Sequence, residues 1–474
     1  MCFDRCTKYI EFFRSKQFIS ALIGTILSFS SFLYVSWASP TIPLLTSSNS
    51  PIGVQLTGEE VSWMVSSLSL GMMLGSIILS FLIDSIGRKK TMLVAAFLLF
   101  APWFLIVFAD SIVMLVIARV VGGTGSGISI GVVYLYVGEI AEKKHRGTLC
   151  TMPTIGLVLA TILMYSIGPF VSYTILAIVC GFVPFTFIVT SYFMAESPYY
   201  LIKINQRENA KESLKYLSGT DNVEKWMSEI EITIQNDGTS KFTFTELIFE
   251  RNHRKSFLIV IGLKTLYLFS GLLVINAYIQ TIMEQSQTSL SAETSSLIFA
   301  AIQIPCVIIS SVLVDKFGRR PLLIISSLGC ALSLAGEGVY FYLMQRSDVV
   351  LSNAYFVPTL CLTLYFIMIS FGIANIAFVA LGELFTLKAK KIGGTVFAFY
   401  TGFIIFVSYK TFNPIVESWG MHVAFWIYAS VCVLGVFFGL FILPETKGKT
   451  FDEIQRILHG KEKYNKKAAD SVSC

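Results

Sequence analysis

The stretch DSIGRKK at residues 84–90 recurs as DKFGRR at residues 315–320, which indicates that the chain is built from two related halves. In each copy an Asp, a Gly and basic residues separate one long apolar run from the next. Two further pairs of stretches occur in the same order, GEIAEKKHRG at 138–147 with GELFTLKAKKIGG at 382–394, and ESPYYL at 196–201 with PETKG at 444–448. The shared order of the three pairs predicts a duplicated architecture.

The composition indicates a protein whose surface is covered largely by lipid. Of its 474 residues, 54% are hydrophobic and 14% are charged, whereas soluble domains carry about 25% charged residues. The nine cysteines form no CxxC pair and the four histidines show no HExxH spacing, so we expect no disulfide framework, metal centre or other cofactor. A polar, basic start leads into a full-length apolar run, so we expect no cleavable signal peptide.

Apolar runs of about 20 residues are long enough to cross a bilayer, and spanning segments of this kind must be helical because lipid offers the backbone no hydrogen-bond partner. The sequence therefore predicts an all-α membrane protein with twelve transmembrane helices in two six-helix repeats. The predicted spans are 17–40, 61–83, 91–109, 112–138, 149–169, 174–194, 256–280, 294–314, 321–343, 354–382, 393–416 and 421–443.

The loops between these runs alternate in charge. Basic residues gather in every second loop, as GRKK at 87–90, EKKHRG at 142–147, GRR at 318–320 and KAKK at 388–391. The first of the other loops, near 41–60, has no basic residue. By the positive-inside rule, both termini and the basic loops are cytoplasmic. The net charge of +6 therefore indicates orientation in a lipid bilayer and not nucleic-acid binding.

The spans divide the chain into four parts. We predict an N-terminal six-helix half at 1–194, a cytoplasmic helical linker at 195–255, a C-terminal six-helix half at 256–448 and a cytoplasmic tail at 449–474. The linker has the pattern of short amphipathic helices and a turn signal, Asn-Asp-Gly, at 236–238. We interpret it as a structural linker in preference to a ligand-binding domain.

The repeated motifs place opposite charges where they can form a cytoplasmic charge latch. Gly87 and Gly318 permit a tight turn between two helices, and the Arg that follows offers a planar fork that pairs bidentately with a carboxylate. Such pairs can form in one state of a carrier and break in another. The alternative is that these charges only cap helices and fix topology. The predicted latch residues are Asp84, Arg88, Glu139, Arg146, Glu196, Asp315, Arg319, Glu383, Lys390 and Glu445.

Parallel six-helix repeats with a substrate site between them describe a rocking transporter, and the motifs resemble one family of such carriers. DSIGRKK, the stretch 118–147, AESPYYL, DKFGRR and LPETKGKTFDEI at 443–454 resemble the sugar porter family of the major facilitator superfamily, along almost the whole chain. The stretches 37–45 and 410–426 are most similar to insect facilitated trehalose and glucose transporters. The resemblance implies a plasma-membrane carrier, monomeric as the transport unit, that moves a hexose or disaccharide by alternating access.

The resemblance also implies where substrate would bind, and there the chain departs from the family pattern. Thr154, Tyr267 and Leu268 stand where the family has Gln, and Leu273 stands where it has Asn. Loss of these amides leaves fewer partners for sugar hydroxyls. Aromatic rings remain in the tenth span and in Tyr267 and Tyr278. The candidate substrate-binding residues are Thr154, Tyr267, Leu268, Leu273, Asn276, Phe378, Thr401 and Lys264.

Ionisable residues within the spans are functional hypotheses by default. Arg119 matches an Arg that proton-coupled members of the family use together with an Asp in the first span. Here the first span has no acidic residue and Tyr34 lies near that position, so we expect facilitated diffusion. Lys264 either snorkels or pairs with a neighbour, or it serves as a cation in the substrate cavity. We expect Glu337 to be buried in a helix and hydrogen-bonded, or to lie near the outer interface.

The leading function hypothesis is a facilitative sugar transporter. One alternative keeps the carrier fold but moves another small solute, such as an organic anion, which the lost amides and Lys264 favour. A second alternative is a non-transporting sugar sensor. An enzyme is not expected, because the sequence shows no nucleophile–base set, metal cluster or phosphate-binding loop. The glycine-rich GGTGSG at 122–127 lies inside the fourth span, where small residues allow close helix packing.

Overall fold

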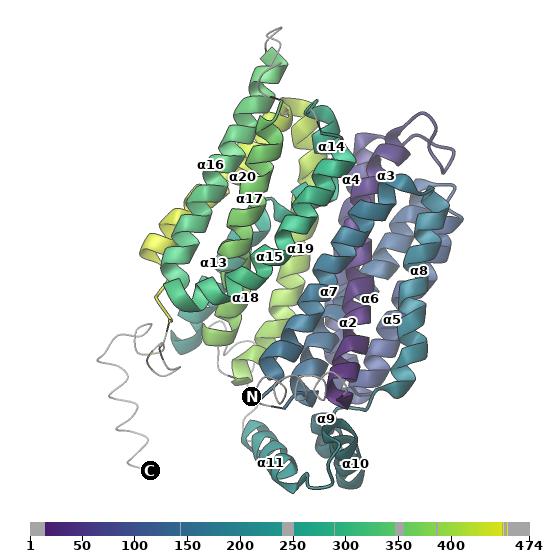
Figure 1. Ribbon diagram of the computed structural model, residues 1–474, viewed down its shortest axis with the longest axis vertical. Helices are drawn as coiled ribbons and strands as arrows, with labels where there is room; N and C mark the ends of the chain where they lie inside the picture. The colour runs from purple at the N-terminus through teal and green to yellow at the C-terminus, as the bar shows by residue number, and fades with distance from the viewer. Residues whose placement is uncertain are drawn as a thin grey trace, which may run out of the picture. The chain divides into compact units, whose positions relative to one another are not determined.

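The computed structural model describes residues 15–142, 144–238, 251–288, 290–346, 355–384 and 387–447, together with residues 449 and 453. Within these ranges all regular secondary structure is helical (Figure 1). Ten segments are long and apolar enough to cross a membrane, and each overlaps one of the predicted spans. The two other predicted spans, 294–314 and 393–416, fall within helices of 26 and 33 residues.

The contacts divide the chain into two compact units, Met1–Lys241 with Ala398–Phe406, and Phe242–Phe397 with Val407–Cys474. The long helices of the first unit are α2 (Lys16–Ser36), α4 (Gly58–Ser85), α5 (Arg88–Val107), α6 (Ile112–Ile140), α7 (Arg146–Ile167) and α8 (Tyr173–Thr190). Its short helices are α3 (Ala38–Thr46), η1 (Gly168–Phe170), η2 (Ser191–Phe193), α9 (Pro198–Lys203), α10 (Arg207–Ser218) and α11 (Glu224–Gly238).

The described residues of the second half of the chain are also mostly helical. The helices are α13 (Arg251–Phe269), α14 (Leu272–Gln285), α15 (Ala292–Phe317), α16 (Arg319–Arg346), α17 (Val357–Phe371), α18 (Ile373–Leu384), α19 (Leu387–Trp419) and α20 (Met421–Phe441). Nearly all of them belong to the second unit, except that residues Ala398–Phe406 of α19 group with the first.

Equivalent helices pack in equivalent pairs within each unit. In the first unit α4 packs on α6, and α5 packs on both α6 and α8. In the second unit α15 packs on α17, and α16 packs on both α17 and α20. Likewise, α2 packs on α6 and α8, as α13 packs on α18 and α20. The packing therefore repeats in the same order as the sequence motifs.

The backbones of α4 and α6 touch directly. Gly71 and Gly75 of α4 face Gly123 and Gly127 of α6. A Cβ atom on Gly71 would collide with the carbonyl oxygen of Val120, and one on any of the other three would collide with the backbone of the facing helix. The glycine-rich stretch of the fourth span thus serves close helix packing.

Breaks occur within three spanning segments. The first span changes from α2 to α3 at Trp37, because Pro40 has no N–H to donate to the carbonyl four residues before it. α13 and α14 meet at Gly271, whose φ of +95° favours glycine. α17 and α18 meet at Gly372, where a Cβ atom would collide with the side chain of Ser326 in α16. Each break occupies only one or two residues, so the two helix segments follow each other directly.

The linker helices α9, α10 and α11 have a small apolar core of their own. Leu214, Val223, Met227 and Ile230 are buried together, with Trp226 and other partly buried residues packed around them. The α10–α11 pair also carries exposed ion pairs, among them Lys211 Nζ to Glu224 Oε1 at 2.6 Å and Arg207 Nε to Glu231 Oε1 at 2.9 Å. The predicted amphipathic helices of the linker are present in the structure.

The predicted turn at 236–238 is wrong, since the α11 backbone stays helical through Gly238. Asn and Gly are also the residues that most often end helices. Within the described residues, the Asn-Asp-Gly stretch is part of helix α11. Local sequence cannot distinguish these two uses of the same residues.

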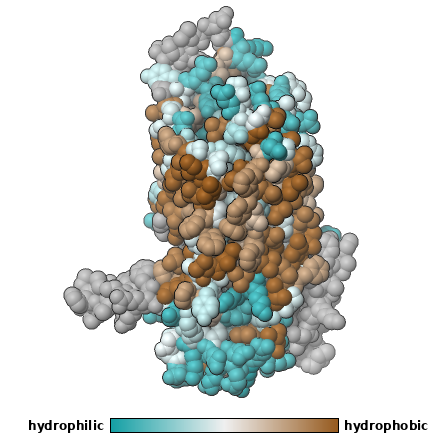
Figure 2. All heavy atoms as spheres, turned by 90° about the vertical axis from the view of Figure 1, so that its right-hand side faces the viewer, coloured by the Kyte–Doolittle hydropathy of each residue, from teal (hydrophilic) through white to brown (hydrophobic). Residues whose placement is uncertain are grey.

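One face of the first unit is hydrophobic over its middle. Figure 2 views the side of α5 and α8 and shows a band of hydrophobic residues between two hydrophilic ends. The exposed large side chains of α5 and α8 include Phe97, Phe104, Ile178 and Phe182. A soluble monomer rarely exposes so wide an apolar area, so lipid is the natural cover for this face.

Candidate functional site

The first copy of the repeated motif builds a charged cluster around a glycine turn. Gly87 joins α4 to α5 with a φ of +87°, which glycine adopts without strain. Nε and Nη2 of Arg88 donate to the two carboxyl oxygens of Glu139, each at 2.8 Å. The two side chains are 7% and 11% exposed, so this bidentate ion pair is buried. It joins the start of α5 to the end of α6.

Glu196, which follows α8, completes the cluster. Its Oε1 accepts from the backbone N–H groups of Arg88 at 3.0 Å, Lys89 at 3.2 Å and Ser197 at 2.8 Å. The first N–H groups of a helix have no partner inside the helix, so this carboxylate satisfies the start of α5. The hydroxyl of Ser197 donates to Glu139 and so connects the two acidic residues. Three helix ends thus meet at one site.

The second unit contains the same turn. Gly318 joins α15 to α16 with a φ of +91°. Glu445, which follows α20, accepts from the backbone N–H groups of Arg319 and Arg320, both at 3.1 Å. A Cβ atom added to Gly318 would lie 2.7 Å from Glu445 Oε2, and one added to Gly87 would lie 2.7 Å from Glu196 Oε2. Any other residue at Gly87 or Gly318 would have an unfavourable positive φ, and its side chain would collide with the glutamate.

The second basic residue of each motif donates to backbone carbonyl groups in the segment just before the motif glutamate, at the end of α20 in the second unit and just after η2 in the first. Lys89 Nζ donates to the carbonyl oxygen of Met194 at 2.7 Å. Arg320 donates through Nε to the carbonyl of Gly439 at 3.0 Å and through Nη2 to that of Leu440 at 2.6 Å. Basic side chains at helix C-termini satisfy the last carbonyl groups. Lys89 and Arg320 therefore act as helix caps. Arg88 instead forms an ion pair, as the charge latch predicts.

The two motif glutamates differ in their electrostatics. Burial raises the pKa of Glu196, although the N–H groups of Ser197, Lys89 and Arg88 oppose this effect. Burial would also raise the pKa of Glu445, but the N–H groups of Lys447, Arg319 and Arg320 outweigh it and lower the pKa. Although the two glutamates accept similar hydrogen bonds, the ionised form is less favourable at Glu196 than at Glu445.

The remaining latch residues lie at the edges of these clusters or outside the described side chains. Asp84 Oδ1 is 2.7 Å from Lys203 Nζ and 3.9 Å from Arg88 Nη1. Arg146 Nη2 donates to the carbonyl oxygen of Ala141 at 3.5 Å. The predicted latch residues whose side chains lie outside the described part of the structure are Asp315, Glu383 and Lys390.

Arg119 is buried inside the first unit, with 1% of its surface exposed. Its Nε donates to the carbonyl oxygen of Met64 at 3.3 Å, and its Nη1 donates to that of Tyr34. The guanidinium carbon also lies 5.6 Å from the centre of the Trp37 ring. Carbonyl dipoles and an aromatic face thus stabilise this cation beside the position where the resemblance placed an Asp.

Thr154 of α7 is engaged with a residue that the sequence did not single out. Its hydroxyl lies 2.9 Å from the hydroxyl of Tyr134 in α6. Both side chains are half-buried. A Thr in place of Gln therefore leaves a hydroxyl pair that joins two helices of the first unit.

The candidate cavity residues of the second unit cluster around the break between α13 and α14. Lys264 is 6% exposed, and its Nζ lies 5.8 Å from the centre of the Tyr267 ring. Leu268 is buried, whereas Tyr267, Leu273 and Asn276 are half-buried. Tyr278 is buried and its ring centre lies 4.6 Å from that of Phe412. The side chain of Phe378 lies outside the described residues, and Thr401 is half-buried in the part of α19 that groups with the first unit.

Glu337 is fully buried in α16. Burial was expected, but the expected hydrogen bond is not found, because neither carboxyl oxygen has a hydrogen-bond partner among the residues that the structure describes. Sequence could not show this, since it depends on which side chains α17 and α20 bring to this point.

The family is decided by the sequence as a whole. A family model described as "Sugar (and other) transporter" matches residues 18–458. The chain belongs to the sugar (and other) transporter family. Membership of this family and the ten apolar helices show that the chain is a multi-pass membrane protein. It belongs with transporters and is not an enzyme.

Several insect members of the sugar (and other) transporter family are similar to this chain. The facilitated trehalose transporter Tret1 of Bombyx mori is 30% identical over 409 residues, which cover 85% of this chain and 80% of that protein. The protein of the same name from Polypedilum vanderplanki is 28% identical over 449 residues, which cover 93% of this chain and 86% of the relative.

Solved structures confirm the fold. The inward-open xylose transporter XylE of E. coli matches with a TM-score of 0.78 at 20% identity, over 93% of this chain and 99% of that chain. Its partially occluded inward-open form matches with a TM-score of 0.77. The fold of this sugar (and other) transporter is therefore that of XylE.

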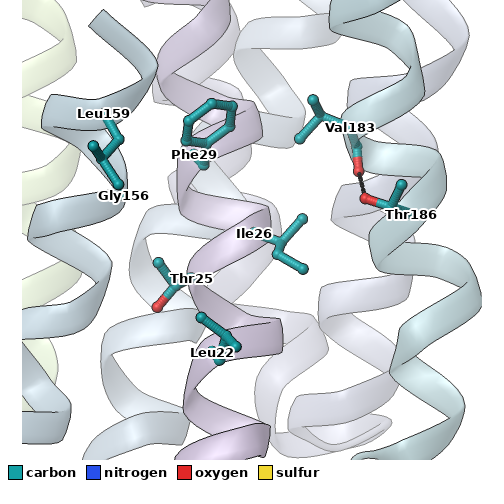
Figure 3. Close-up of a pocket in the computed structure, with 8 residues that line it drawn as sticks. All are labelled: Leu22, Thr25, Ile26, Phe29, Gly156, Leu159, Val183 and Thr186. Carbon is teal, nitrogen blue, oxygen red and sulfur yellow. Dashed lines mark hydrogen bonds between the residues drawn. The ribbon is translucent and has the colours of Figure 1, made fainter. Parts of the chain in front are cut away.

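A groove of this sugar (and other) transporter lies between α2, α7 and α8 (Figure 3). Its polar side chains use their hydroxyls locally, since Thr25 donates to the carbonyl of Ala21 at 2.8 Å and Thr186 to that of Val183 at 2.7 Å. Leu22 and Leu159 at its edge are exposed. Such an apolar lining suits lipid, and its two hydroxyl groups already donate hydrogen bonds within their own helices. The lining residues are Leu22, Thr25, Ile26, Phe29, Gly156, Leu159, Val183 and Thr186.

Sequence reasoning missed four contributors to the site of this sugar (and other) transporter. Lys89 and Arg320 could have been identified from the sequence, because both copies of the motif have a second basic residue directly after the Arg. Ser197 and Tyr134 carried none, since a lone Ser or Tyr near a span has many uses. Their roles depend on contacts between distant segments.

Proposed function

We propose that this protein is a facilitative sugar transporter that moves a hexose or trehalose by alternating access. Its membership of the sugar (and other) transporter family carries the proposal. Two insect relatives named facilitated trehalose transporters support it. The proposed fold is the major facilitator fold with twelve transmembrane helices, in which α15 and α19 supply the two spans beyond the ten candidates.

The proposed organisation follows the repeat. Six-helix halves at 1–194 and 256–448 are joined by a cytoplasmic linker at 195–255 and followed by a cytoplasmic tail at 449–474. The protein acts as a monomer in the plasma membrane, with both termini in the cytoplasm. The alternation of basic and neutral loops supports this orientation.

The glycine-turn clusters act as latches in the proposed cycle. Each cluster joins the glycine turn and the start of the helix after it to a glutamate from a distant segment, Glu196 after α8 or Glu445 after α20. The bonds are directional and lie at helix ends, so a small rotation of one helix can break several of them together. They would hold each half rigid in one state and release it in another.

Arg119 supports facilitated diffusion. Because carbonyl oxygens of Tyr34 and Met64 and the ring of Trp37 stabilise this cation, it needs no titrating acid in the first span. The span itself, α2 with α3, contains no Asp or Glu. A carrier built this way would move its substrate down a gradient without loading a proton at this position.

We place the substrate site at the candidate residues on α7, the α13–α14 break, α18 and α19. The half-buried positions of Tyr267, Leu273 and Asn276 around a helix break support this proposal, because broken helices in transporters form substrate sites. The proposed binding residues are Thr154, Lys264, Tyr267, Leu268, Leu273, Asn276, Phe378 and Thr401.

Uptake into liposomes containing the purified protein tests the proposal. We expect saturable entry of radiolabelled trehalose or glucose that stops when the gradient is dissipated. Protein-free liposomes and liposomes containing the Arg88→Ala variant serve as controls. If correctly folded protein gives no saturable flux of either sugar, facilitative sugar transport is excluded.

A second candidate function is transport of a small organic anion by the same fold. The buried cation of Lys264, beside the Tyr267 ring, is the observation that favours it. In that case Lys264→Gln would abolish anion uptake, whereas sugar uptake would be absent in both proteins. Unchanged anion uptake in the variant would exclude this function. Ligand-induced thermal stabilisation without flux would instead point to a sugar sensor.

A further inference from the structure

Glu337 is a carboxyl group in the interior of a membrane-spanning helix. It occupies the centre of the sequence Gly336-Glu337-Gly338 in α16 and has 0% of its surface exposed. Nine residues separate it from Arg346, the last residue of α16, which corresponds to about 13 Å at a rise of ~1.5 Å per residue. It is therefore too far from the helix end for a Glu side chain to reach water.

The two glycines bring neighbouring helices close on both sides. A Cβ atom on Gly336 would lie 3.2 Å from Cys361 Sγ in α17. A Cβ atom on Gly338 would collide with the ring of Trp426 in α20 and would lie 3.2 Å from the carbonyl oxygen of His422. The turn of α16 that carries Glu337 is therefore packed tightly against α17 on one side and against α20 on the other, and the Cys361 thiol is close enough to interact electrostatically with the carboxyl group.

Tyr340 of α16 and Cys361 of α17 interact electrostatically with Glu337, and neither group can supply a positive charge. Tyr340, one turn along α16, donates its hydroxyl proton to the carbonyl of Ser286 at 2.8 Å. Tyr365 of α17 donates to the carbonyl of Ser270 at 3.0 Å. The imidazole of His422 packs with its centre 5.1 Å from that of the Trp426 ring.

Further titratable groups lie in the rest of α20 and in α15 and α18, which also pack against α16. Tyr428 of α20 faces Gly271, and Cys432 faces Cys330. The acidic and basic residues of α15 and α18, which lie in the first or last turns of those helices, are Glu293, Asp315, Lys316 and Glu383. Among the described residues, no Lys, Arg or His forms an ion pair with Glu337, and neither of its oxygens accepts or donates a hydrogen bond.

An ionised carboxylate is very unfavourable in such a place. Removing a charge from water without a partner costs several kcal/mol even after relaxation, whereas a neutral acid is comparable to a buried hydroxyl or amide. The protonated form is therefore the stable form while α16, α17 and α20 remain packed. Ionisable residues retained inside a membrane span usually have a function.

We propose that Glu337 is a proton-binding site inside the second unit, occupied while α17 and α20 enclose it and released when these helices separate from α16. The sign of the resulting pH dependence follows from linkage. The packed state binds one proton more than a state in which Glu337 meets water, so a rise in pH favours the separated state. Packing of the second unit therefore weakens on the alkaline side. This site is independent of Arg119 and of the substrate that the carrier moves.

Chemical labelling and infrared spectroscopy of the full-length protein in liposomes test the proposal directly. Dicyclohexylcarbodiimide enters lipid and reacts with protonated carboxyl groups. The acid adds its O–H across one C=N bond of the reagent and the adduct rearranges to an N-acylurea, so that no group leaves. We expect an adduct on Glu337 by mass spectrometry, with a yield that falls about tenfold per pH unit above its titration midpoint. Glu284, an exposed residue in α14, is the internal reference for a carboxyl group in contact with water.

The Glu337→Gln variant provides the second readout, because an amide mimics the neutral acid in shape and charge. We expect the infrared spectrum of the wild type to contain the C=O stretch of a protonated acid at neutral pH and the variant to lack it. We also expect the wild-type Tm to fall with rising pH more steeply than that of the variant. Identical infrared spectra of the two proteins at neutral pH would overturn the proposal, whether or not the reagent reaches the site. An equal pH dependence of the two Tm values would do the same.

Discussion

Charged residues of this protein form two kinds of contact that differ in their energetic value. Arg88 and Glu139 are 7% and 11% exposed and bond through two atoms each. Arg207 and Glu231 are 64% and 30% exposed in the linker. Breaking a buried pair leaves an uncompensated charge, whereas an exposed pair loses little because water replaces the partner. The distinction separates the cluster residues from the many other charges near the helix ends.

Replacement of Glu139 by Gln should therefore strongly destabilise the protein. We expect a loss of about 3–5 kcal/mol, since the guanidinium of Arg88 keeps its burial and loses its counter-charge. Thermal unfolding in detergent measures the effect. Glu231→Gln in the exposed pair is the matched control and should change stability by about 0–1 kcal/mol. Equal losses in the two variants would contradict the buried-pair interpretation.

The two motif glutamates should respond to pH in opposite directions. The pKa of Glu445 is lowered from 4.5, so its contribution to stability is present above that value and is lost as the pH falls through the lowered pKa. The pKa of Glu196 is raised from 4.5, so its contribution diminishes as the pH rises from 4.5 through the raised pKa.

Differences in Tm between the wild type and the variants Glu445→Gln and Glu196→Gln, measured across this pH range, test these signs. The Glu445→Gln difference should shrink on acidification, while the Glu196→Gln difference should grow. Parallel pH profiles would show that the two carboxylates have equivalent surroundings.

At the scale of helices, the contact between α4 and α6 depends on four positions without a side chain. Gly71, Gly75, Gly123 and Gly127 each bring the two backbones together. Lipid gives helices no hydrophobic reason to associate, so van der Waals contact between such surfaces has to hold the pair. α4 and α6 therefore form one rigid element of the first unit.

Replacement of Gly123 by Ala should push these helices apart. We expect a loss of about 1–3 kcal/mol, the usual range for overpacking, together with a lower Tm in detergent. Gly138→Ala lies in the same helix, where nothing is within 4 Å of an added Cβ. That control should be neutral or slightly stabilising, because Ala is the better helix former. A similar Tm for the two variants would argue against backbone contact at Gly123.

Much of the helical plan could be predicted from sequence, and its limits have physical causes. Apolar runs located the ten candidate spans because lipid imposes length and hydrophobicity on each span separately. The breaks at Trp37, Gly271 and Gly372 were not predicted, since Pro and Gly also occur within unbroken membrane helices. The glycine turns and their glutamates were predicted because the same short motifs occur in both halves of the sequence. The partner of Thr154, and the lack of a hydrogen-bond partner for Glu337 among the described residues, could not be predicted, because both depend on side chains from other helices.

At the scale of the whole molecule, the repeat predicts that both glycine turns matter for function. Gly87→Ala and Gly318→Ala each force a side chain into a positive-φ turn at a distance of 2.7 Å from a glutamate oxygen. We expect each single variant to lose most of its transport, because either defect disables one half of a two-part cycle. Sugar uptake per molecule of folded protein measures the effect.

Gly147→Ala is the control for these two variants, because nothing lies within 4 Å of an added Cβ at that position. It should retain wild-type uptake. If only one of the two turn variants lost transport, the halves would contribute unequally and the duplicated motif would have lost its role in the other half.

The two glycine turns also bear on the history of the chain. Each is closed by a glutamate, two backbone N–H groups and a second basic residue that all come from its own unit. An ancestral polypeptide of half this length would therefore have contained all the bonds of one such turn. Gene duplication and fusion could then have joined two copies without creating a new contact at either turn, after which the second basic residue diverged to Lys89 and Arg320, while the glutamate stayed the same in both copies.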